Sequence, residues 1–122
     1  MANNYQQKGD RIVWTNATGS AVVSGQLVKI GNILGVALVD IANGASGDVA
    51  IEGVFSGVPK VSAAVFAQGE KLIWDVSAAK FDDSSATPAT GDVTGGAIAF
   101  VAGADAETTC TIKLTPGNTA VA

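Results

Sequence analysis

The sequence contains no histidine and only one cysteine, and both shortages limit the chemistry it can perform. Without histidine, Ser-His-Asp and Cys-His catalytic arrangements and histidine-ligated metal sites are excluded. A single cysteine cannot form a disulfide within the chain. Cys110 also lies in an alternating strand pattern between Thr109 and Thr111, which favours a buried apolar role over a nucleophile. Most hydrolase classes are therefore ruled out.

Charged and aromatic residues are scarce as well, at 15% and 6% of the 122 residues, although 48% are hydrophobic. Globular chains carry about 25% charged residues, so the shortage indicates either a Gly/Ala-rich bias or an exterior partly covered by partner proteins. The net charge of −4 and the lack of any basic run are the wrong pattern for binding phosphate backbones or anionic lipids. We expect no nucleic acid and no membrane among the partners.

Nucleotide-binding loops are absent, because no lysine directly follows a glycine and no two glycines are separated by a single residue. Paired carboxylates stay open as an acid and a base drawn from Glu52, Glu70, Glu107 and several aspartates, and such a pair would make the chain an enzyme. Turns and solvated strand faces, where carboxylates normally reside, are the simpler interpretation. We therefore expect no catalytic residue and no small-molecule substrate.

Two further groups of residues offer a ligand site on composition alone. The first comprises Asp82, Asp83, Ser84 and Asp92. Their oxygens suit calcium, but the spacing of a known calcium loop is missing, which favours a hydrophilic loop. The second group is Trp14 and Trp74, which could stack a sugar or a base, yet each alternates onto the apolar side of its strand and fits a core position better. We expect no metal and no cofactor.

Short runs of alternating apolar and polar residues, separated by Gly, Asn, Asp and Ser, predict an all-β fold. We expect a small antiparallel barrel or sandwich of about seven short strands, with at most one short helical turn. The expected strands span residues 11–15, 27–30, 33–40, 48–56, 71–75, 97–101 and 107–114. The helical turn is expected at Ser62–Phe66 and a tight hairpin at Gly31-Asn32, and Cys110, Ile112 and Leu114 should share the inward face of the last strand.

Three parts are expected along the chain: a flexible N-terminal arm at residues 1–9, a single β domain at 10–116 and a C-terminal tail at 117–122. Within the domain, Ser77–Gly96 is rich in small and polar residues. It should form the longest exposed loop, interrupted by a short extended piece at Lys80-Phe81.

The N-terminal arm is polar and carries one large apolar side chain, that of Tyr5. Its residues bury too little apolar area to offset the roughly 1–2 kcal/mol per residue that backbone ordering costs. The arm should therefore become ordered only against a neighbouring subunit or another partner. The expected protein-interface residues are Asn3, Asn4, Tyr5 and Gln6.

Several stretches, spread in order along nearly the whole chain, carry a resemblance to a known family. They are Tyr5 with Gly9-Asp10, Val23–Val28, Leu34–Ala37, Ile51–Phe55 with Pro59-Lys60, Phe66–Asp75, Gly96–Ala99 and Thr111–Leu114. Through them the chain resembles the phage capsid cement, or head decoration, proteins. The stretch Gly95–Ala99 and the long Ser77–Gly96 loop depart from the family pattern, which affects the expected oligomer contacts there.

The resemblance implies a β-rich structural protein without catalytic activity. Such a protein assembles as a homotrimer on the outer surface of a phage or prophage head and clamps neighbouring major capsid subunits together. The first residues lack the features of a signal peptide, so we expect synthesis in the host bacterial cytoplasm and a final place on the virion. The alternative is a carbohydrate-binding or adhesin-like β module displayed on a virion, which glycan binding by the purified chain would reveal.

Overall fold

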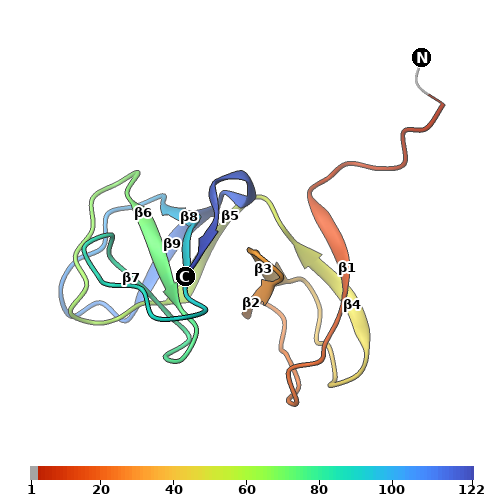
Figure 1. The fold of residues 1–122 in the computed structure, drawn as a ribbon, viewed down its shortest axis with the longest axis horizontal. Helices are drawn as coiled ribbons and strands as arrows, with labels where there is room; N and C mark the ends of the chain where they lie inside the picture. The colour runs from red at the N-terminus through yellow and green to blue at the C-terminus, as the bar shows by residue number, and fades with distance from the viewer. Residues whose placement is uncertain (1–2) are drawn as a thin grey trace.

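The computed structural model describes residues 3–122, which form ten β-strands in two antiparallel sheets and one 3-10 turn at Pro116–Asn118 (Figure 1). The predicted all-β fold is confirmed. The prediction allowed either a barrel or a sandwich. The sheets have four and six strands and do not close into a barrel, which leaves the open arrangement of two sheets. None of the described residues forms a helix capable of crossing a membrane.

The N-terminal sheet has the strand order β1-β4-β3-β2. Its strands are β1 (Arg11–Thr15), β4 (Ser46–Ala50), β3 (Ile33–Ala37) and β2 (Leu27–Ile30). The predicted hairpin is confirmed, because β2 pairs with β3 across Gly31-Asn32, where Gly31 has the left-handed φ of +56°. The expected strand 33–40 ends early, at Ala37, where the chain bends at Leu38-Val39 before Ile41 forms an isolated bridge with Val22.

The single strand expected at residues 48–56 is wrong, because these residues belong to two strands in different sheets. β4 ends at Ala50, and β5 (Val54–Pro59) begins the C-terminal sheet. Gly53 lies between them with a φ of +120°, a conformation that side-chain-bearing residues rarely adopt. Gly53 is thus close to the point where the chain crosses from one sheet to the other.

The C-terminal sheet has the order β5-β9-β8-β6-β7. Its further strands are β9 (Thr109–Leu114), β8 (Val93–Ala99), β6 (Lys71–Asp75) and β7 (Lys80–Asp82), and β10 (Ala120–Val121) also pairs with β8. The extended piece expected at Lys80-Phe81 is confirmed as β7. The predicted inward face of the last strand is also confirmed, because Cys110, Ile112 and Leu114 are buried while Thr109 and Lys113 are exposed.

Three segments of the C-terminal sheet differ from the prediction. The loop expected to reach Gly96 ends earlier, because Val93–Gly96 lies in β8, with Gly96 close against Leu34. Residues 117–122, expected as a tail, contain β10, which pairs with Thr94 and Val93. Ser62–Phe66 forms no helical turn, because the Phe66 backbone exchanges two hydrogen bonds with Gly103 and its ring is buried.

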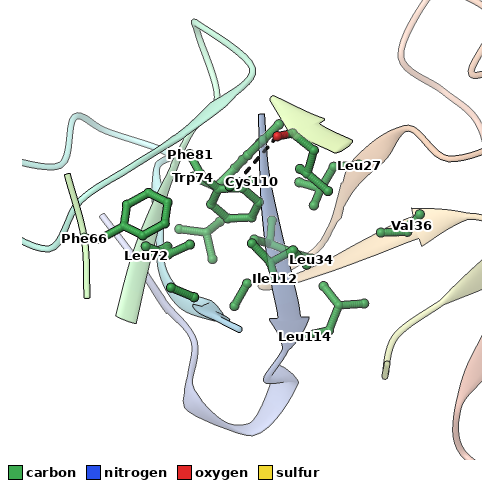
Figure 2. Close-up of a cluster of buried hydrophobic side chains, with 14 of the residues drawn as sticks. Leu27, Leu34, Val36, Phe66, Leu72, Trp74, Phe81, Cys110, Ile112 and Leu114 are labelled. Atoms are coloured by element: carbon green, nitrogen blue, oxygen red, sulfur yellow. Dashed lines mark hydrogen bonds between the residues drawn. The ribbon is translucent and has the colours of Figure 1, made fainter. Parts of the chain in front are cut away.

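The main core lies between the two sheets, where β2 and β3 supply Leu27, Leu34 and Val36. The rest of this cluster comes from the C-terminal sheet and the segment between β5 and β6 (Figure 2). In that cluster the Trp74 and Phe81 rings meet edge to face, with centroids 4.9 Å apart. A second, smaller cluster covers the opposite face of the N-terminal sheet. It consists of Val22, Val28, Ala37, Ile41 and Val49, with Trp14 and Ile30 packed against it. The expected core positions of both tryptophans are confirmed, Trp14 being half-buried.

Candidate docking surface

The four residues expected to contact a partner lie on an extended N-terminal segment that runs away from both sheets (Figure 1). Asn3, Asn4, Tyr5 and Gln6 are all exposed, and none is in a strand. The Tyr5 side chain is 72% exposed, the highest value among the large hydrophobic residues exposed in residues 3–122. Met1 and Ala2, which the expected arm includes, lie outside the described residues.

A groove runs along the junction of the two sheets, and we call it the central groove. Its volume is about 570 Å³, within the range of about 300–1,000 Å³ typical of ligand pockets. It is lined by Val23–Leu27, Ser56, Gly57, Pro59, Trp74 and Ala79. An adjoining groove of about 390 Å³ shares Gln26, Leu27, Trp74 and Ala79 with it, so the two form one continuous depression.

The central groove combines an apolar floor with polar rims. Leu27 and Trp74 are buried core residues whose remaining exposed surface faces the groove. The rim from Val23 to Gln26 is a closed turn, since the Gln26 side-chain oxygen accepts a hydrogen bond from the Val23 N–H at 3.2 Å. On the opposite wall, Ser56 and Gly57 form a bulge in β5 and are out of register with β9. Such a site suits an apolar or aromatic side chain carried on an extended segment.

A second apolar surface lies at the far end of the C-terminal sheet. Val65, Phe100 and Val101 are each about half exposed. Their two loops run side by side, because the Gly69 N–H donates to the Ala99 carbonyl at 2.7 Å and the Gln68 amide donates to that of Phe100 at 3.1 Å. We call these three residues the distal patch. Single exposed apolar residues are ordinary, but neighbouring ones indicate a surface that a partner can cover.

The glutamates considered as an acid and base pair each serve a separate turn. Glu70 accepts hydrogen bonds from the Ser84 N–H and hydroxyl, both at 2.9 Å, and Glu107 accepts one from the Ala104 N–H. The Ser84 backbone bond is the main cause of a lowered pKa at Glu70. A general acid at neutral pH needs the opposite shift. Glu52 is exposed in the turn between β4 and β5.

The acidic residues considered for calcium include Asp83 and Asp92, whose carboxylates accept hydrogen bonds from residues near them in the fold. Asp92 is buried, and its two carboxylate oxygens accept hydrogen bonds from the N–H groups of Val76 and Ala89. The Ser85 hydroxyl bonds Asp83 and is the main cause of the lowered pKa of that carboxyl group. Across residues 3–122, no three Asp, Glu or Cys side chains gather in a way that could hold a metal ion.

The single cysteine lies in the main core, as its strand pattern predicts. Cys110 is 8% exposed, and its thiol donates to the Val58 carbonyl at 3.5 Å (Figure 2). Burial raises the pKa of the Cys110 thiol to about 11. A nucleophilic cysteine needs a thiolate at neutral pH and hence a lowered pKa, so this environment opposes such a role.

Comparison with known families places most of the chain in one family. The family model for phage cement proteins matches residues 6–114, which include both sheets except β10. This chain belongs to the phage cement protein family. The family assigns it a structural role in the phage capsid and a place on the virion. No curated protein and no solved structure gives a significant match.

Sequence reasoning for this cement protein missed the central groove and a buried lysine. The groove is assembled from four separate chain segments, and no local pattern marks their meeting. Lys60 is fully buried, with its ammonium bonded to three backbone carbonyls. Its only signal in the sequence was its place in the Pro59-Lys60 pair that the family resemblance includes.

Proposed function

We propose that this chain is a decoration protein that binds neighbouring major capsid subunits on the outer surface of a phage or prophage head and stabilises the shell as a homotrimer. The observation that carries the proposal is the family match over residues 6–114. The surface agrees with such a role. It offers a projecting arm with Tyr5, the apolar central groove and the distal patch, three features that suit protein partners.

Binding to heads tests the proposal. Purified protein is mixed with expanded heads that lack it, the heads are sedimented, and the bound protein is measured against concentration. We expect saturable binding, and a variant lacking Asn3–Gly9 should bind more weakly. Because these residues are exposed and form no strand, the deletion should leave the melting temperature nearly unchanged. Intact binding by the deletion variant would contradict an interface role of Asn3, Asn4, Tyr5 and Gln6.

Light scattering tests the oligomeric state separately. A homotrimer has three times the chain mass of 12.1 kDa. A stable dimer at high concentration would contradict the trimer, whereas a monomer would restrict trimer formation to the capsid surface.

The alternative of a carbohydrate-binding module gains little from the site. Trp74 belongs to the main core and Trp14 packs on the second cluster, so the two indoles form no common stacking platform. A glycan array with the purified protein tests the alternative directly, and specific binding would favour it.

A further inference from the structure

We infer that the central groove holds the Tyr5 side chain of a second copy of this chain, so that arm-to-groove contacts link the subunits into a ring. The inference rests on the proposed homotrimer and names the contact that would build it. It uses two surfaces that no catalytic or metal-binding role explains: the projecting arm and the groove at the junction of the sheets.

Within one chain, the arm lies apart from the central groove, at the opposite edge of the N-terminal sheet (Figure 1). It leads into β1, one edge of the N-terminal sheet, whereas the groove borders β2 at the other edge. From β1 the arm runs away from both sheets. In residues 3–9, the side chain that forms a hydrogen bond is Gln7, and its acceptor is the nearby Arg11 carbonyl at 3.4 Å. The arm is therefore presented to another molecule.

The chemistry of the groove matches an aromatic side chain with a polar tip. Tyrosine buries a large apolar ring while its hydroxyl needs a hydrogen-bond partner. The groove places the apolar surface of Leu27 and Trp74 beside the polar side chains of Ser24, Gln26 and Ser56. In residues 3–9, Tyr5 is the one aromatic residue.

Charge also favours a second copy as the occupant. Lys8 is the one charged residue of residues 1–9, and the rest of the chain holds six basic and eleven acidic residues, a net charge of −5. One of these acids adjoins the groove, because Asp40 accepts a hydrogen bond from the N–H of the lining residue Ser24 at 2.8 Å. Three extended residues span about 10 Å, so Lys8 can approach Asp40 when Tyr5 occupies the groove.

Arm and groove are different surfaces, so each subunit gives one contact and receives another. Head-to-tail contacts of this kind form closed rings when the rotation between subunits closes, whereas an isologous dimer requires the same surface on both partners. The contact is thus compatible with the proposed trimer.

Disulfide trapping in the full chain tests the inference, because the native Cys110 is buried and does not compete. The variant carries Tyr5→Cys and Ser56→Cys together, and a matched control carries Tyr5→Cys with Val13→Cys, an exposed position on β1. After mild oxidation, we expect covalent oligomers that end at the trimer for the first variant and only background for the control. A cross-linked monomer would show that the arm occupies its own groove and would overturn the inference, as would the absence of cross-links above the control.

Self-association of single variants provides the second readout. Tyr5→Ala should weaken it by roughly 10- to 100-fold, as loss of an aromatic anchor typically does. Tyr5→Phe, which keeps the ring, should weaken it less, and the arm control Gln7→Ala should stay close to the wild type. Equal self-association of Tyr5→Ala and wild type would overturn the inference. If Tyr5→Ala in that case also bound heads as the wild type does, the arm-to-groove contact would be refuted and the proposed capsid function would be supported. If the wild type itself did not bind heads, the proposed capsid function would be refuted instead.

Discussion

Replacing Lys60 with methionine should destabilise the fold, because this buried ammonium joins two loops without any carboxylate partner. Its three N–H donors reach the carbonyls of Val61 at 2.9 Å, Ser62 at 3.3 Å and Glu107 at 3.2 Å. The ammonium also lies 5.7 Å from the centroid of the Phe66 ring. The one ion pair within residues 3–122 is Arg11 with Asp48, so Lys60 is held by dipoles and an aromatic face alone.

The expected loss follows from these contacts. Each carbonyl left without a partner in a buried site costs about 1–3 kcal/mol, and loss of the cation–π contact adds about 0.5–2 kcal/mol. Removing the ammonium also removes its desolvation cost of several kcal/mol, which offsets part of this loss. Ser62 and Glu107 are exposed residues whose carbonyls regain water in part. We therefore expect Lys60→Met to lower the free energy of unfolding by about 3 kcal/mol, or the melting temperature by about 10–15 °C.

Urea and thermal unfolding followed by circular dichroism measure this loss. Lys113→Met is the matched control, since Lys113 is exposed and its replacement should change the stability by less than about 0.5 kcal/mol. Equal stability of the two variants would refute the reasoning, because the three carbonyl contacts would then contribute nothing net.

Three other perturbations have defined outcomes. Trp74→Ala should cost about 3–5 kcal/mol, because Trp74 is 6% exposed and packs on Phe81, and an unchanged melting temperature would contradict this. Gly103→Ala should cost about 1–3 kcal/mol in urea unfolding, because the new methyl group would overlap the Phe66 ring, whereas the control Gly117→Ala meets open space. With the thiol pKa raised from 9.0 to about 11, Cys110 stays protonated in the folded state while the unfolded thiol ionises, so stability should fall as the pH rises from about 9 to 11. A Cys110→Ala variant should show a smaller fall, and equal slopes would contradict the assignment.

Local alternation was sufficient to predict the fold class and the positions of most strands. The period of two in Thr109–Leu114 identified the inward face correctly, because side-chain direction in a strand depends only on its own backbone. Which sheet a strand joins depends on contacts far along the chain. The run from Asp48 to Ser56 therefore looked like one strand, although its halves pair with β1 and with β9. Gly95-Gly96 was expected at the end of the Ser77–Gly96 loop, yet both residues lie within β8, where tight packing against Asn118 and Leu34 requires small residues.

In the candidate site, too, local features could be predicted and features built from distant segments could not. The arm was open to prediction, because polarity and the isolated Tyr5 are local properties. The central groove was not, since its walls come from segments as distant in sequence as Val23 and Ala79. The burial of Lys60 was equally hidden, because lysine is usually exposed and one of its acceptors, Glu107, lies 47 residues away.

Thermal release of DNA from heads tests the central claim most directly. Full heads lacking this protein are heated with and without saturating amounts of it, and DNA release is followed with a fluorescent dye that cannot enter intact shells. If the chain stabilises the capsid by binding neighbouring major capsid subunits, release should shift to higher temperature in proportion to the amount bound. Heads that carry the protein at saturation and still release DNA at the same temperature would contradict the account.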